Sequence, residues 1–177
     1  MEDILLVATS PRKGGNSDDA AQLVLDRLRK KGRAAKLIHL HESRIERCRG
    51  CLNCQQGKQC PIDDDFPALW SLVKEARAVV YFVPVYWCSP PGLMKDFIDR
   101  TVVDYGAGAM RGKEVHLVSI AQAAGFDPQE QIVETWVGWL GGPALKTKLR
   151  LIAFHKGELA KNARAVDELE QFADGLA

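Results

Sequence analysis

The sequence lacks an excess of charge of either sign, since its 24 lysines and arginines stand against 23 aspartates and glutamates. Attraction to nucleic acid or to an anionic membrane surface needs a strong basic field, so neither is an expected partner. Long hydrophobic runs are missing as well. The apolar stretch from Ile4 to Ala8 has no basic leader and is too short for a signal peptide or a membrane span. We therefore expect a soluble, cytoplasmic protein.

Two glycine-rich nucleotide motifs are also absent. Without GxxxxGK[ST] a nucleotide triphosphatase is disfavoured, and without GxGxxG so is a Rossmann dinucleotide site. The sequence shows no internal repeat. Its 177 residues suit one compact domain over residues 1–177, with a sizeable core.

Short β-branched runs alternate with amphipathic segments, a pattern typical of a parallel sheet covered by helices on both faces. Asp65 and a capping box at Asp127-Pro128-Glu130 predict helix starts, and Gly32 predicts a helix end. The expected strands are 3–9, 35–40, 78–83, 114–121 and an edge strand at 145–154, and the first and last expected helices are 17–31 and 158–173. This rhythm predicts a doubly wound α/β fold of strand order 2-1-3-4-5, whose ligands bind beyond the carboxyl ends of the strands.

The loop after the first strand, TSPRKGGNS, combines hydroxyls, flexible backbone and two cations. Its N–H groups and the following helix N-terminus would attract a phosphate, with Arg12 adding charge. Further hydrogen bonds would come from Ser10, Asn16 and Ser17. A plain turn in which Asn16 or Ser17 caps the helix explains the loop equally well.

Four of the five cysteines lie within thirteen residues, in a loop at about 41–64. Cys48, Cys51, Cys54 and Cys60 give CxxCxxCxxxxxCP, a spacing close to that of bacterial ferredoxins, and predict the ligands of one [4Fe–4S] cluster. A zinc site, reduced thiols or an adventitious disulfide are the alternatives. Cys88 stands apart, and we expect it to pack locally as a small apolar group.

The loop after the third strand, Pro84 to Ser89, places aromatic rings where this fold binds ligands. An isoalloxazine ring needs such an apolar platform, with N–H groups near its pyrimidine edge. If the loop stood alone, Tyr86 and Trp87 would be better explained as core or interface aromatics.

Taken together, TSPRKGGNS, CRGCLNCQQGKQCPIDDDF, PVYW and LMKDFIDR resemble the NAD(P)H-dependent FMN reductase superfamily, and within it the iron–sulfur flavoprotein branch, over residues 3–125. The resemblance implies a flavodoxin-like fold and four cysteine ligands for a cluster. The loop after the fourth strand, AQAAG, departs from the family's usual glycine-rich sequence. The implied FMN contacts are Ser10, Arg12, Asn16 and Ser17 at the phosphate, Pro84, Val85, Tyr86 and Trp87 at the isoalloxazine, and Gln122 and Gly125 in the fourth-strand loop.

The resemblance further implies an FMN-dependent oxidoreductase that passes electrons between FMN and a [4Fe–4S] cluster, with NAD(P)H as a possible donor and a small molecule or protein as partner. No side chain is expected to act as catalytic acid, base or nucleophile. A homodimer or homotetramer is expected, in which Tyr105, Trp136 and Trp139 serve either at the subunit contact or in the core. The alternatives are a cluster-free NAD(P)H-dependent FMN or quinone reductase, an FMN-dependent dehydrogenase of a small metabolite, and a zinc-stabilised binding module.

The remaining charged motifs are expected to be structural. Helix capping explains Asp63 to Asp65 as well as catalysis does, and Lys95, Asp99 and Arg100 suit salt bridges at the surface or a subunit contact. No ligand spacing relates the four histidines, so no chemistry is assigned to His39, His41, His116 or His155.

Overall fold

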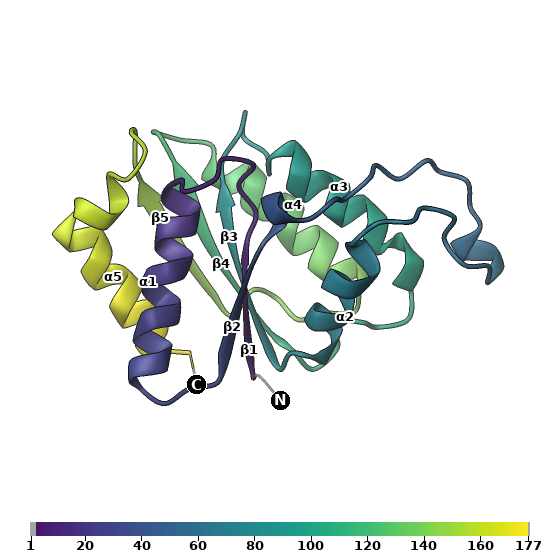
Figure 1. Ribbon diagram of the computed structural model, residues 1–177, viewed down its shortest axis with the longest axis horizontal. Helices are drawn as coiled ribbons and strands as arrows, with labels where there is room; N and C mark the ends of the chain where they lie inside the picture. Colours follow the sequence, from purple (N-terminus) through teal and green to yellow (C-terminus); the bar gives the residue numbers. More distant parts are fainter. Residues whose placement is uncertain (1–2, 177) are drawn as a thin grey trace.

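The computed structural model describes residues 3–176 and contains one five-stranded parallel sheet (Figure 1). The strands lie in the order β2-β1-β3-β4-β5, and every neighbouring pair is parallel. This order confirms the doubly wound, flavodoxin-like α/β prediction. The strands are β1 (Ile4–Ala8), β2 (Ala35–His39), β3 (Ala78–Pro84), β4 (Glu114–Ala121) and β5 (Thr147–Ile152).

Helices cover both faces of the sheet (Figure 1). The helices α1 (Asn16–Lys30) and α5 (Ala163–Asp174) pack on one face, and α2 (Phe66–Glu75), α3 (Gly92–Arg100) and α4 (Phe126–Trp139) on the other. Successive β1 side chains enter opposite cores, because strand side chains alternate between the two faces. Leu6 thus packs with α1 and α5, whereas Leu5 and Val7 pack with α2 to α4. No helix within residues 3–176 is long and apolar enough to span a membrane.

Helix ends account for most differences from the sequence predictions. Gly15 is the N-cap of α1, so neither Asn16 nor Ser17 caps it. The Asp127 capping box is wrong, because α4 begins at Phe126 and the Asp127 carboxylate pairs instead with Arg150 of β5. Gly32 ends α1 as predicted, with a left-handed φ of +70°.

The last helix is shorter than predicted. A 3₁₀ turn, η4 (Leu159–Lys161), precedes it, and α5 begins after Asn162, whose side chain accepts hydrogen bonds from the Arg164 and Ala165 N–H groups. Asp65 does precede α2, but its carboxylate accepts from the Arg44 N–H at 2.7 Å and does not cap the helix.

The order of the strands changes direction at β1, because β2 lies on one side of β1 and β3 on the other. β1 and β3 are therefore neighbours, although β2 lies between them in sequence. The Thr9 N–H and Oγ1 both donate to the Phe82 carbonyl, at 3.1 and 3.0 Å, and hold the two strand ends together. Loops leaving such neighbours diverge to opposite faces and leave a crevice beyond the carboxyl ends. This crevice is where such a fold binds its ligands.

Candidate functional site

A cavity of about 620 Å³ lies at the carboxyl edge of the sheet, between the loops that follow β1, β3, β4 and β5. All ten side chains predicted to contact a cofactor line it. They are Ser10, Arg12, Asn16, Ser17, Pro84, Val85, Tyr86, Trp87, Gln122 and Gly125. Three segments far apart in the sequence thus meet at one place, and their binding roles stay predictions.

The loop after β1 is folded by its own hydrogen bonds. The Arg12 N–H donates to Ser10 Oγ at 3.1 Å, and the Gly15 N–H donates to the Arg12 carbonyl at 3.2 Å. The Asn16 amide donates to the His155 carbonyl at 2.9 Å and so ties α1 to the loop after β5. The Ser17 side chain is buried beneath the first turn of α1.

A tight turn follows β3. Tyr86 and Ser89 exchange backbone hydrogen bonds of 2.9 and 3.0 Å, while Trp87 and Cys88 between them have φ values of +49° and +59°. Two left-handed central residues are typical of a type I′ turn, and such strain in bulky residues clusters at functional sites. Trp87 is 100% exposed at the tip of the turn. Cys88 is exposed too, at the cavity beside Gly125, so the prediction that it packs as a small buried apolar group is wrong.

Gly125 closes the cavity from the β4 side. Its φ is +92°, and a Cβ atom there would lie 2.9 Å from Val85 Cγ1 and 3.1 Å from Cys88 Cα. No larger residue fits without shifting the β3 turn. The Val85 N–H donates to the Ile120 carbonyl at 2.7 Å, which fixes the same turn to the end of β4.

The cysteine loop has a different character. It extends beyond α2 and α3, away from the sheet (Figure 1), and carries the short helical turn η2 (Cys54–Gln56). Cys48 and Cys51 are exposed and Cys54 and Cys60 half-buried. Gly50, Leu52 and Gly57 all take left-handed φ values, between 61° and 72°, so the loop curls around its cysteines. All four cysteines line a second cavity, of about 940 Å³.

A buried ion pair holds both ends of this loop. The side chains of Arg100 and Asp64 are only 1% and 0% exposed and face each other. Arg100 also donates to the Glu46 carbonyl at 3.0 Å and lies 3.8 Å from Cys60 Sγ. The Glu46 N–H in turn donates to Asp64 at 2.8 Å. The prediction of a surface or subunit salt bridge is therefore wrong for Arg100, because its guanidinium turns inward to this carboxylate.

The Asp64 carboxyl is ionised where it holds the end of the cysteine loop against Arg100. Burial by itself raises the pKa of this carboxyl, but the Arg100 hydrogen bond and those from the Glu46 and Phe66 N–H groups outweigh burial and hold the pKa below its usual value. A charged carboxylate thus meets a charged guanidinium beside one of the four thiols.

The three predicted interface aromatics divide between core and surface. Trp136 is buried, and its indole N–H donates to Thr101 Oγ1 at 2.9 Å, so it is a core residue. Tyr105 and Trp139 are more than half exposed, with ring centroids 5.7 Å apart, and both line the cysteine cavity.

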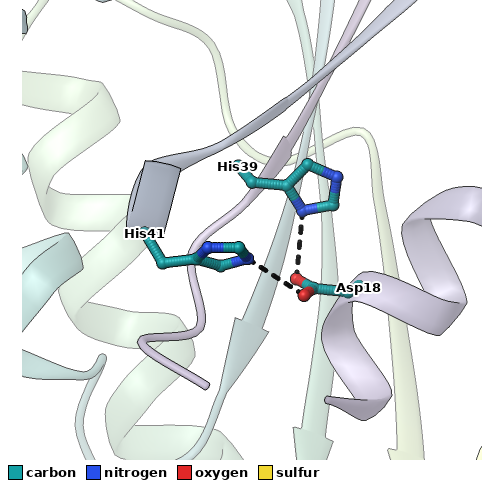
Figure 2. A group of neighbouring side chains, drawn as sticks. All are labelled: Asp18, His39 and His41. Carbon is teal, nitrogen blue, oxygen red and sulfur yellow. Dashed lines mark hydrogen bonds and ion pairs between the residues drawn. The ribbon is translucent and has the colours of Figure 1, made fainter. Parts of the chain in front are cut away.

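The sequence analysis did not predict one polar cluster that the structure contains. Asp18 of α1, His39 at the end of β2 and His41 of η1 (Leu40–Glu42) converge, each imidazole facing a different oxygen of the one carboxylate (Figure 2). The signal was the His-x-His spacing at the predicted end of the second strand, which keeps the two imidazoles close together along the chain.

Known proteins resemble this chain in sequence and in fold. The sequence model of the family described as NADPH-dependent FMN reductase matches residues 3–156. An iron–sulfur flavoprotein of Archaeoglobus fulgidus is 34% identical over 124 residues, which cover 70% of this chain and 55% of that protein. An iron–sulfur flavoprotein of Methanosarcina thermophila is 26% identical over 97 residues, or 55% of this chain and 51% of that protein.

A solved structure shares the fold at low identity. The FMN-dependent NADH-azoreductase from Bacillus anthracis, in complex with FMN, superimposes with a TM-score of 0.72 at 14% identity, over 98% of this chain and 99% of the other. The chain spans about half the length of the curated relatives it matches. The predicted resemblance to this family and to its iron–sulfur flavoprotein branch is confirmed. The chain belongs to the NADPH-dependent FMN reductase family.

Proposed function

We propose that this protein is an FMN-dependent oxidoreductase that holds FMN in the 620 Å³ cavity at the carboxyl edge of the sheet. The observation that supports it most is the convergence on one cavity of all ten residues predicted from separate sequence segments. When bound, FMN supplies the redox chemistry, and the protein binds, orients and electrostatically tunes it.

The β1 loop fits a phosphate. Arg12 is exposed at the rim of the cavity, where its guanidinium can reach an anion. Gly15, Asn16 and Ser17 line the cavity at the N-terminus of α1, where the helix dipole favours an anion. We infer that Arg12 and Ser10 bind the phosphate directly, while Asn16 positions the loop through its bond to the His155 carbonyl.

The opposite wall of the cavity fits an aromatic ring system. Val85 and Tyr86 line it with the Ala121 to Gly125 loop, so apolar surface faces this part of the cavity. The strained turn at Trp87 and Cys88 holds these groups in place before the ligand arrives.

A [4Fe–4S] cluster suits the cysteine loop better than a single zinc ion because of the spacing of its cysteines. CxxCxxCxxxxxCP is close to the spacing of bacterial ferredoxins. Zinc motifs usually consist of two separated CxxC pairs and not of three cysteines in tandem. We infer Cys48, Cys51, Cys54 and Cys60 as the ligands of the cluster.

Such a protein would exchange electrons with a small molecule or a protein partner, with NAD(P)H as a donor. The exposed pair Tyr105 and Trp139 beside the cysteine cavity supports a homodimer or a homotetramer, since aromatic residues are enriched at interface cores. Light scattering of the purified protein would distinguish either assembly from a monomer.

The FMN proposal is tested by titrating the flavin-free protein with FMN. Arg12→Gln should weaken binding by about ten- to a hundredfold, because a charge-assisted phosphate bond contributes about 1.5–3 kcal/mol. Lys13→Gln is the matched control, since it removes a cation from the same loop without touching the cavity. Equal affinity in both variants would refute the phosphate site.

A further inference from the structure

We propose that Asp18, His39 and His41 form a binding site for a Zn²⁺ ion. This site is separate from the cysteine loop and from the 620 Å³ cavity proposed to hold FMN, called the flavin cavity below. The three residues come from α1, the end of β2 and η1, and their ligand atoms all lie within 4.8 Å of one another (Figure 2). Within residues 3–176 they are the only such group of histidine, cysteine, aspartate or glutamate side chains.

The distances suit a small divalent ion. His39 Nδ1 lies 3.1 Å from Asp18 Oδ1, and His41 Nε2 lies 3.0 Å from Asp18 Oδ2. A tetrahedral zinc with bonds of about 2.0–2.1 Å needs ligand atoms about 3.4 Å apart. Each histidine–aspartate distance is thus within a few tenths of an ångström of this value, and all the ligand atoms lie within 4.8 Å of one another. Two imidazoles and one carboxylate are a ligand set that zinc accepts, with water as the fourth ligand.

The surroundings favour a cation. The side chains of Asp18 and His41 are each 9% exposed and that of His39 is 22% exposed, so solvent screens the carboxylate weakly. With both imidazoles neutral, Asp18 therefore leaves the cluster with a net negative charge that a divalent ion would neutralise.

Zinc binding here has a simple proton balance. Each neutral imidazole carries one proton, which sits on the nitrogen facing Asp18 when the hydrogen bonds form. On coordination His39 binds through Nδ1 and its proton moves, by exchange with water, to Nε2, whereas His41 binds through Nε2 and its proton moves to Nδ1. No net proton release is needed when both rings begin neutral.

The site lies behind the proposed phosphate loop. Asp18 Oδ2 also accepts from the Gly14 N–H at 2.7 Å, yet none of the three ligands lines the flavin cavity. Zinc would therefore stabilise the loop without touching the flavin. This consequence for FMN affinity rests on the proposed function, whereas zinc binding itself does not.

Zinc titration of the flavin-free full chain tests the proposal, with Cys48, Cys51, Cys54 and Cys60 changed to serine so that the cysteine loop cannot bind zinc. One Zn²⁺ per chain is expected. Changing either histidine ligand to glutamine should weaken binding by more than about a hundredfold, since loss of a second-shell partner alone costs 10–100-fold. His155→Gln is the matched control and should leave zinc affinity unchanged, because His155 is outside the cluster.

No stoichiometric zinc, or unchanged affinity in His41→Gln, would overturn the site and leave a hydrogen-bonded triad that ties β2 to α1. If the four-serine chain fails to fold, Co²⁺ is added to the chain with its cysteines intact. A cobalt species without sulfur charge-transfer absorption, lost in His41→Gln, supports the site, and cobalt bound only with thiolate absorption refutes it.

Discussion

The flavin cavity and the cysteine loop are both assembled from chain segments rich in turns, but they are held in opposite ways. The cavity walls are tied to the sheet by bonds such as that from the Val85 N–H to the Ile120 carbonyl. The cysteine loop extends from the body of the protein and is fixed at its ends, around Asp64 and Arg100. We infer that the first site is preorganised for its ligand, whereas the second is completed by its ligand, as metal sites commonly are.

The largest effect is expected at the loop's anchor. Arg100→Met should lower the free energy of unfolding by about 3–5 kcal/mol, because it leaves the buried Asp64 carboxylate without its partner. It should also release iron from the purified protein. Lys95→Met is the control, since Lys95 pairs with Asp99 on the exposed surface of the same helix. Denaturant unfolding and iron analysis measure both effects. Equal stability of the two variants would contradict the proposal that Arg100 and Asp64 anchor the loop.

Between pH 6.5 and 4, acid sensitivity should come from the sheet. Burial lowers the pKa of His116 in β4 to about 4, from an ordinary 6.5. Between these values the unfolded chain binds a proton that the folded chain does not, so stability falls as pH drops from about 6.5 to 4, by about 3 kcal/mol. His116→Leu should flatten this part of the stability profile. An unchanged pH slope in denaturant unfolding would contradict the assignment.

Preorganisation of the flavin cavity is tested at Gly125. Gly125→Ala should weaken FMN binding by about tenfold or more, because its Cβ would lie 2.9 Å from Val85 and force the β3 turn to move. Gly57→Ala is the control for a left-handed glycine, because a methyl group at Gly57 would meet nothing within 4 Å. FMN titration that finds both variants equal to the unaltered protein would show that the cavity is adaptable.

The smallest effect on stability is expected within the cysteine loop. Cys51→Ser should abolish cluster binding but change the stability of the metal-free protein by less than about 0.5 kcal/mol, because Cys51 is exposed. Its FMN affinity should stay unchanged. Cys88→Ser, which alters the cysteine outside the loop, should retain iron. Iron retained in Cys51→Ser would reject the ligand assignment.

Local patterns predicted the sheet order and the loops around the flavin cavity, because both follow from strand periodicity and from the rule that ligands bind at the strands' carboxyl ends. The family resemblance implied the individual residues within those loops. Pairings between distant residues left no such pattern. Asp64 meets Arg100 across 36 positions, and Asp18 meets His39 across 21. Such contacts depend on how helices pack against strands, which spacing along one segment does not encode.

We propose that this chain holds FMN in a preformed cavity and a [4Fe–4S] cluster in its cysteine loop. An anaerobic visible spectrum of freshly purified protein tests both cofactors, with flavin, iron and sulfide measured on the same sample. One FMN with about four irons and four sulfides per chain is the expected result. Protein without flavin would contradict FMN binding, and FMN without iron, once oxygen damage is excluded, would contradict the cluster.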